Sequence, residues 1–180
     1  MSRPAPLALR LLPHALTALR LALAPVLFLT IIRGRGDAAA ACLVVAMITD
    51  AADGPMARRS GVASRGGAWF DVWTDFALIE AAFLGFAAGG TGPPGLPVLI
   101  ALSFALFAGT ARMTYAIYDP VGRYIGGILM AAAFAVVALR DLYFAEAAYL
   151  ATYGALFTTM AARTGFAARL IWRQVRPTAR

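Results

Sequence analysis

Long apolar segments, separated by short charged or glycine- and proline-rich ones, run along nearly the whole chain. A transmembrane helix needs about 20 predominantly apolar residues, and residues 15–32 form the first such segment. Hydrophobic residues make up 61% of the 180 residues and charged residues 14%, whereas a soluble domain is about half apolar and about a quarter charged. A soluble chain of this size has too little polar surface to cover so many apolar side chains. The pattern therefore predicts an all-α integral membrane protein.

Six transmembrane helices account for the apolar segments. We expect them over residues 15–32, 38–59, 68–88, 96–118, 121–139 and 142–162. The second apolar run is short (38–49), so it spans a membrane only if its helix continues through Asp50 to about Arg59. Glycine and proline dominate residues 89–95, which predicts a loop between the third and fourth helices.

Both ends of the chain are predicted to lie outside the spans. Residues 1–13 combine leucines with two arginines, which predicts a short interfacial helix that ends at Pro13. Residues 164–180 are expected to form a basic cytoplasmic tail, and residues 1–180 as a whole form one membrane-embedded domain. A secretory signal peptide is the alternative interpretation of the first apolar run, and the further spans argue against it.

The distribution of arginines predicts the orientation, because loops that carry an excess of basic residues stay in the cytoplasm. With six spans, both termini lie on one face, together with the arginine-rich connections between spans two and three and between spans four and five. The opposite face holds only Arg33, Arg35 and Arg140. We therefore expect a multi-pass protein of the cytoplasmic (inner) membrane with both termini in the cytoplasm. The arginines interrupt apolar runs instead of lining a soluble face, so no nucleic-acid partner is expected.

Four carboxylates lie in two neighbouring spans, near their predicted cytoplasmic connection. Asp50 and Asp53 are three residues apart, and Asp71 and Asp75 are four apart, so each pair occupies one face of its helix. Asp53 and Asp71 are equally far from the middle of the connection, and so are the outer two acids. Two antiparallel helices therefore bring all four to matching depths. An ionisable residue inside a span costs about 2.5–3.5 kcal/mol on insertion scales, which indicates a functional role.

Cations are the natural neutralisers of this cluster, because four like charges so close together repel one another. A set of carboxylates without His or Cys suits Mg²⁺ or Mn²⁺. Two such ions, roughly 3.5–4 Å apart, are able to clamp a phosphoryl group. The sequence therefore predicts a two-metal site whose ligands are Asp50, Asp53, Asp71 and Asp75.

Small residues continue the two acidic stripes. Gly54 and Ala57 follow on the first helix and Gly67 precedes on the second, so a ligand has room to lie against the backbone. Arg58 beside the stripe offers a bidentate fork for phosphate, and Ser64 adds a hydroxyl. The surroundings thus favour a phosphorylated substrate.

The acidic residues form part of a longer spacing, Asp50-x2-Asp53-Gly54-x2-Ala57-Arg58-x8-Gly67-x3-Asp71-x3-Asp75. At all eight specified positions this spacing resembles the signature of the CDP-alcohol phosphotransferase family. The segment Pro13-His14-x-x-Thr17-x-x-Arg20 is also similar to the Pro-Asn-x-x-Thr-x-x-Arg motif with which the family begins its first span, with His14 in place of Asn.

The resemblance implies a function, a set of ligands and an assembly. Members of the family transfer the phosphoalcohol of a CDP-alcohol, here CDP-diacylglycerol in the first place, to a hydroxyl acceptor and release CMP. It implies that the four Asp hold two divalent cations, Mg²⁺ or Mn²⁺, and that Asp75 is the general base. It also implies a homodimer. The residues implied to surround the CDP-alcohol are Gly54, Ala57, Arg58, Gly67 and Asp71. Ser64 is added to these expected contacts because of its hydroxyl.

The acceptor stays open at this point. The phosphatidylglycerophosphate and cardiolipin synthases of the family usually have Lys directly after the fourth Asp, where this chain has Phe76. A phosphorylated acceptor needs further cationic side chains, and Arg112 and Arg123 near the cytoplasmic ends of spans four and five are candidates. The alternative for both is an interfacial arginine that only sets topology.

Two other classes of function also fit intramembrane acids. A small proton- or ion-conducting protein uses acids along a path, but here they gather on two spans. A non-enzymatic membrane scaffold tolerates loss of motif residues, but all eight are present. The sequence therefore favours a transferase of substituted phosphate groups.

Overall fold

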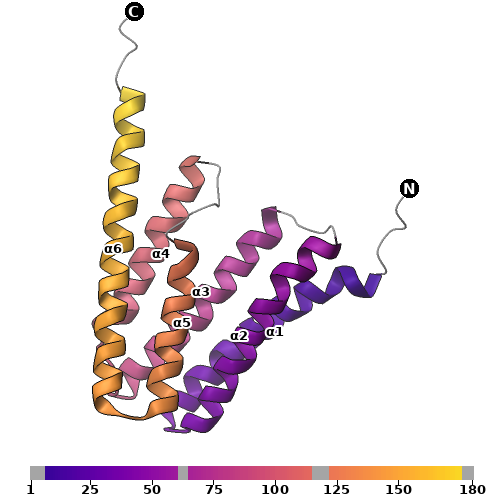
Figure 1. The fold of residues 1–180 in the computed structure, drawn as a ribbon, viewed down its shortest axis with the longest axis vertical. Coiled ribbons are helices and arrows are strands. Elements are labelled where there is room, and N and C mark those ends of the chain that lie inside the picture. Colours follow the sequence, from indigo (N-terminus) through magenta and orange to yellow (C-terminus); the bar gives the residue numbers. More distant parts are fainter. Residues whose placement is uncertain (1–6, 61–64, 115–121, 176–180) are drawn as a thin grey trace, which may run out of the picture.

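The computed structural model describes residues 7–60, 65–114 and 122–175, and within them every element is an α-helix (Figure 1). The six helices are α1 (Leu7–Ile32), α2 (Gly36–Ser60), α3 (Arg65–Ala88), α4 (Gly95–Thr114), α5 (Gly122–Leu139) and α6 (Leu142–Val175). For the described residues, the prediction of an all-α architecture with six helices in these places is confirmed.

Helix α2 continues without a break past Asp50 to Ser60. This continuation is the one that the short apolar run 38–49 needs in order to reach the length of a membrane span. Its residues after Asp50 carry three charges and a glycine, so only the first half of the helix is strongly apolar. The whole helix is nevertheless 25 residues long, which is enough to cross a membrane. The acidic stripe consequently lies in the second half of a continuous helix.

The predicted boundary at Pro13 is wrong, because α1 runs from Leu7 to Ile32 as one helix. Proline removes one backbone hydrogen bond and bends a helix more readily than it ends it when the flanking residues favour helix. Figure 1 shows the first turns of α1 directed away from the bundle. A position of these turns at a membrane surface stays a prediction.

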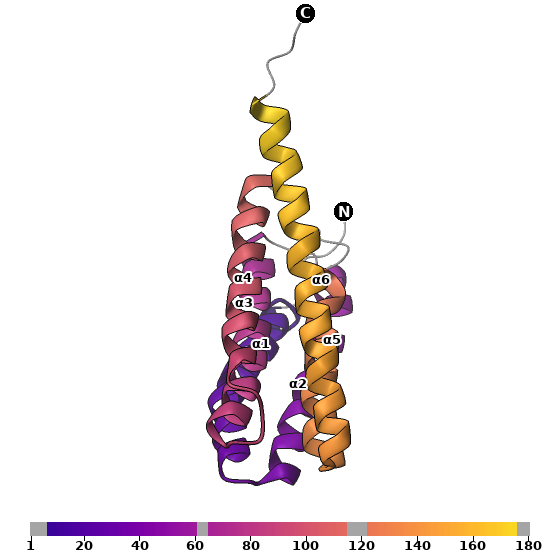
Figure 2. The same ribbon diagram turned by 90° about the vertical axis from the view of Figure 1, so that its left-hand side faces the viewer.

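Helix α6 is longer than its predicted span. It continues from Leu142 to Val175, so much of the segment expected as a basic tail is a helical extension. Figure 2 shows this extension reaching beyond the ends of the other helices.

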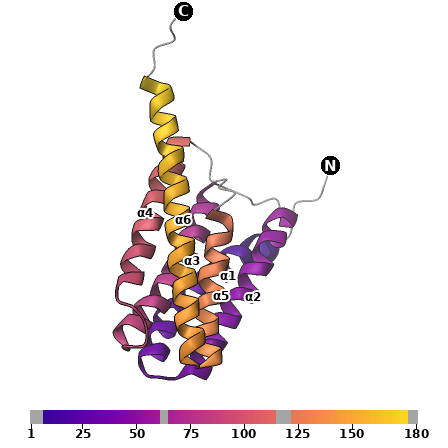
Figure 3. The same ribbon diagram turned by 60° about the vertical axis from the view of Figure 1, so that its left-hand side comes forward.

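The helices pack as two connected groups. Helix α1 packs extensively against both α2 and α3, and α6 packs against α5 and α4 (Figure 3). The two groups share a core of fully buried apolar side chains that includes Leu27, Leu43, Leu78, Leu96 and Leu156. This packing fixes α1 between the two helices that carry the acids.

The end of the bundle that lies far from the acids is held by a turn and an ion pair. The turn between α1 and α2 uses Gly34 with a φ of +67°, which glycine adopts without strain. Arg140, after α5, forms an ion pair with Asp37 at the start of α2. A Cβ at Gly36 would lie 2.9 Å from the Arg140 guanidinium, so this glycine allows the close approach.

By length and apolar composition, one of the described helices contains a segment able to cross a membrane, Ala15–Ile32 of α1. The apolar parts of α4 (Gly95–Ala111) and α5 (Tyr124–Leu139) are shorter, and α2 and α3 contain acids. Large apolar side chains nevertheless face outward on several helices. They include Ile48, Val98, Leu102, Leu150 and Phe157, a surface that a lipid environment suits better than water.

Candidate functional site

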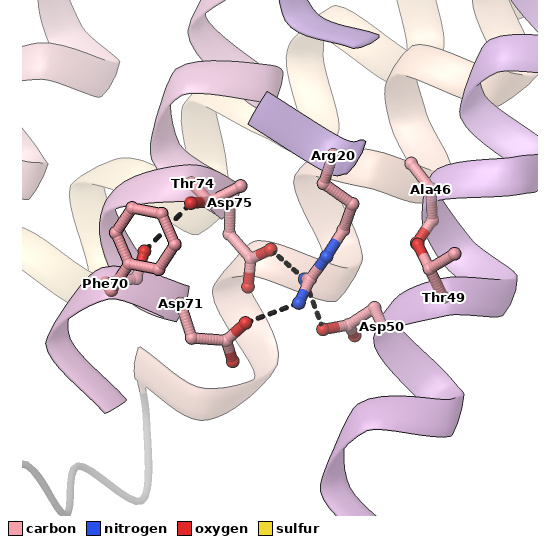
Figure 4. A network of polar contacts seen from close by, with 8 residues as sticks. All are labelled: Arg20, Ala46, Thr49, Asp50, Phe70, Asp71, Thr74 and Asp75. Atoms are coloured by element: carbon pink, nitrogen blue, oxygen red, sulfur yellow. Dashed lines mark hydrogen bonds and ion pairs between the residues drawn. The ribbon is translucent and has the colours of Figure 1, made fainter. Parts of the chain in front are cut away.

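Three carboxylates of α2 and α3 converge beside α1 (Figure 4). Asp50 comes from α2, and Asp71 and Asp75 come from consecutive turns of α3. One oxygen of each carboxylate lies within 4.8 Å of one oxygen of the other two. The structure thus brings together three of the four predicted metal ligands.

A buried arginine of α1 occupies the centre of these acids. Arg20 has no exposed surface, and its Nη1 donates a hydrogen bond to Oδ1 of Asp50 at 2.8 Å. The same Nη1 also pairs with Asp75, and Nη2 pairs with Asp71. One positive charge therefore faces three negative ones, so the described cluster keeps a formal charge of −2.

The carboxylates themselves stay partly accessible although they contact Arg20. The side chains of Asp50, Asp71 and Asp75 are 54%, 39% and 34% exposed. Two neighbouring hydroxyls are engaged elsewhere: Thr49 and Thr74 donate to carbonyl oxygens of their own helices, each at 2.9 Å. Partly exposed carboxylate oxygens at this spacing fit a hard divalent cation such as Mg²⁺ or Mn²⁺.

Several other predicted site residues are only partly described. Gly67 lies on α3, one turn before Asp71, where it is half-buried. The segment 61–64, and with it Ser64, lies outside the described residues. For six further residues the structure describes the helix but not the surroundings of the residue: Asp53, Gly54, Ala57 and Arg58 on α2, Arg112 on α4 and Arg123 on α5. Their predicted roles stay predictions.

A cavity of about 480 Å³ opens beside the acids. Asp50 and Asp75 line one part of it, and the rest of the wall comes from α2, α3, α4, α5 and α6. The wall is largely apolar, with Ile79, Ile100, Leu129, Met130 and Leu156 among its residues. On one side, Phe76 stacks on Phe104 with ring centroids 4.0 Å apart. Asp50 and Asp75 thus line a half-open cavity and do not stand on a flat surface.

Among the described side chains, one that is cationic lines the same cavity. Arg163 of α6 is 9% exposed. Its guanidinium carbon lies 4.6 Å from the centroid of the Phe107 ring, a cation–π distance, and its Nη1 lies 3.5 Å from Oγ1 of Thr110. The cavity therefore has carboxylates and an arginine among its lining side chains.

Sequence reasoning gave no role to Arg20 or to Arg163. Arg20 is the one charged residue of the run 15–32, and the insertion cost that drew attention to the acids applies equally to it. Arg163 stands at the predicted end of the last span, where an arginine is ordinarily interfacial. For Arg20 the sequence carried a usable signal, whereas the burial of Arg163 follows from tertiary packing alone.

Comparison with known proteins identifies one family and two similar relatives. Residues 10–166 match the CDP-alcohol phosphatidyltransferase family. Proteins called "Probable phosphatidylglycerophosphate synthase" from two strains of Mycobacterium tuberculosis (CDC 1551 / Oshkosh and ATCC 25618 / H37Rv) are each 39% identical over 95 residues. These matches cover 49% of this chain and 46% of the relatives, so the matched region spans about half of their length. No solved structure matches significantly.

Proposed function

Because this chain belongs to the CDP-alcohol phosphatidyltransferase family, we propose that it is a transferase of phospholipid biosynthesis. It moves the phosphatidyl group of a CDP-alcohol to a hydroxyl acceptor and releases CMP. The proposed donor is CDP-diacylglycerol. The observation that carries the proposal is the convergence of Asp50, Asp71 and Asp75 beside a cavity large enough for an acceptor.

The acids are the proposed ligands of two divalent cations, Mg²⁺ or Mn²⁺. Asp50, Asp71 and Asp75 supply oxygens from the described cluster, and Asp53 is proposed to complete it from the same face of α2. When bound, the ions neutralise the pyrophosphate and stabilise the leaving CMP. The proposed contacts of the cytidine diphosphate are Gly54, Ala57, Arg58, Ser64, Gly67 and Asp71.

Asp75 is the proposed general base. Its carboxylate belongs to the acidic cluster and also lines the cavity, so a hydroxyl in the cavity would lie on the same side as the reacting phosphorus. A base needs hydrogen-bond reach to the proton that it removes. The proton of the acceptor hydroxyl passes to Asp75 while the hydroxyl oxygen attacks the phosphorus and CMP departs.

The acceptor that we propose is glycerol 3-phosphate. Arg163 gives the cavity a buried positive charge suited to a phosphate, and both matched relatives have names that include phosphatidylglycerophosphate. Phe76 occupies the position where such synthases usually have Lys, and it stacks on Phe104. Arg163 supplies a cation from α6 instead, and Arg112 and Arg123 are proposed to assist it.

The protein is proposed to span the cytoplasmic membrane six times as a homodimer, with both termini and the active site in the cytoplasm. The apolar segment Ala15–Ile32 and the outward-facing apolar side chains of the bundle support a membrane location. A proton- or ion-conducting role finds less support, because the three described acids form one cluster around an arginine instead of a path.

The test is CMP release by the purified protein with CDP-diacylglycerol, Mg²⁺ or Mn²⁺ and a panel of acceptors. The panel holds glycerol 3-phosphate, inositol phosphate, inositol, serine, choline and phosphatidylglycerol. Of these acceptors, we expect only glycerol 3-phosphate to support CMP release from CDP-diacylglycerol. The Asp75→Asn variant should release no CMP but should still bind the CDP-lipid. Turnover by Asp75→Asn would remove its role as base. No CMP release with any acceptor, in protein that is folded but binds no metal, would refute the proposed transferase activity.

A further inference from the structure

Arg20 contacts the same three carboxylates that are the proposed metal ligands, and we propose that it competes with the divalent cations for them. It acts as the internal cation of the acidic cluster: it holds the acids together before the ions bind and lowers the affinity of the site for free ions. Since the competitor is another cation, this inference rests on the proposed function and adds a control of metal binding to it.

Arg20 has little freedom to neutralise its charge elsewhere. Its side chain is completely buried, and a buried charge is strongly unfavourable unless it is paired. Both terminal nitrogens pair with carboxylates: Nη1 with Asp50 and Asp75, and Nη2 with Asp71. The ion pairs are therefore the charge balance of the described cluster.

The position of α1 makes these contacts structural as well as electrostatic. Helix α1 packs against α2 and against α3, and Arg20 pairs with acids from both. Without a cation, three carboxylates whose oxygens lie within 4.8 Å of one another would repel. Arg20 thus keeps the acidic faces of α2 and α3 together.

A metal ion coordinated by these carboxylates would lie close to the guanidinium. Metal–oxygen distances are about 2.0–2.1 Å for Mg²⁺, and Nη1 lies 2.8 Å from one of the same oxygens. Like charges this close repel in a partly desolvated site. Each ion that binds therefore weakens the contacts of Arg20 or is itself held less tightly.

This competition couples the ions to the substrate. The pyrophosphate of a CDP-alcohol brings negative charge to the ions, which offsets the repulsion from Arg20. Free ions should consequently bind weakly and bind more tightly when nucleotide is present. An uncharged residue at position 20 should remove much of this dependence.

The experiment is a Mn²⁺ titration of the purified, metal-stripped protein, followed by electron paramagnetic resonance. In the absence of nucleotide we expect Arg20→Gln to bind Mn²⁺ at least about tenfold more tightly than the wild type, because one repelling charge is gone. The metal-free variant should have a lower Tm, which Mn²⁺ restores. Arg20→Lys keeps the charge but loses the planar fork, so its affinity should lie closer to that of the wild type than to that of Arg20→Gln.

Arg140→Gln is the matched control. It removes an arginine from an ion pair with an aspartate, Asp37, that is remote from the acids. Its Mn²⁺ affinity should equal that of the wild type. Arg20→Gln binding that is unchanged or weaker would refute the competition and leave the transferase standing. A wild-type protein that binds no Mn²⁺, with or without CDP, would refute the proposed function and this inference with it.

A second measurement applies to the wild type, in case Arg20→Gln does not fold. The Nε–Hε signal of Arg20, identified by its absence from the nitrogen-15 spectrum of Arg20→Lys, should shift or broaden when Mg²⁺ saturates the site. The corresponding signal of Arg140 should not change. An Arg20 signal that is indifferent to Mg²⁺ would overturn the inference.

Discussion

Replacing Arg163 by Met should impair use of the acceptor while leaving use of the CDP-lipid intact. Met keeps much of the apolar volume of the arginine stem but removes the charge that lines the cavity. The two substrates would be affected differently, because Arg163 comes from α6 whereas the acids come from α2 and α3.

The expected magnitude follows from the burial of this side chain. Arg163 is 9% exposed, so its contact with a phosphate would be poorly screened by water. A hydrogen bond to a charged group contributes about 1.5–3 kcal/mol, and about 1.36 kcal/mol corresponds to a factor of ten. We therefore expect kcat/KM for glycerol 3-phosphate to fall about 10- to 150-fold, mainly through KM. The lost cation–π contact with Phe107 should lower the stability by about 0.5–2 kcal/mol.

The assay is CMP release at varied glycerol 3-phosphate and saturating CDP-diacylglycerol, followed by the reverse titration. Arg169→Met is the matched control, because Arg169 is an exposed arginine farther along the same helix. Its KM values should equal those of the wild type. An unchanged KM for glycerol 3-phosphate in Arg163→Met, or an equal rise in the KM for CDP-diacylglycerol, would refute the assignment of Arg163 to the acceptor.

Three further outcomes are expected. Chelation with EDTA should abolish CMP release, and added Mg²⁺ or Mn²⁺ should restore it; activity that persists in EDTA would contradict the two-metal reaction. Gly126 lines the cavity, and an added Cβ meets nothing within 4 Å there, so Gly126→Ala should keep full activity. Gly126→Phe should fill the cavity and lower kcat/KM for the acceptor at least about tenfold. Equal activity of the two variants would show that the acceptor binds elsewhere. Tyr149 donates a hydrogen bond to the carbonyl oxygen of Thr91 at 3.0 Å, so Tyr149→Phe should lower the free energy of unfolding by about 0.5–1.5 kcal/mol with no change in kcat, as thermal melts and turnover assays would measure.

The helices could be predicted from the sequence because each has an apolar run bounded by charge or by glycine and proline. The extension of α2 past Asp50 followed from the same length argument. The predicted boundary at Pro13 is wrong because a proline does not always end a helix, and α1 continues through it. Helix α6 continues beyond its predicted span because its later turns carry arginines, which favour a helix but are costly inside a membrane.

The candidate site was predictable where its residues follow helical spacing. Asp71 and Asp75 are one turn apart, so their common face could be derived from α3 alone. That Arg20 of α1 reaches both of them, and Asp50 as well, depends on the packing of three helices. The cavity depends on five helices, and no local pattern in the sequence encodes its shape or the burial of Arg163.

The ion pairs of Arg20 also bear on how the protein is made. The ribosome synthesises α1 before α2 and α3, so Arg20 emerges before any of its acidic partners. An arginine at the centre of an isolated span costs about 2.5–3.5 kcal/mol on insertion scales, and less toward its end, where Arg20 lies in the segment Ala15–Ile32. The compensating charges arrive later, with Asp50, Asp71 and Asp75. In the proposed membrane topology, the first helix therefore gains its full stability only when the second and third helices are in place. The acidic cluster is complete only after all three helices have been synthesised.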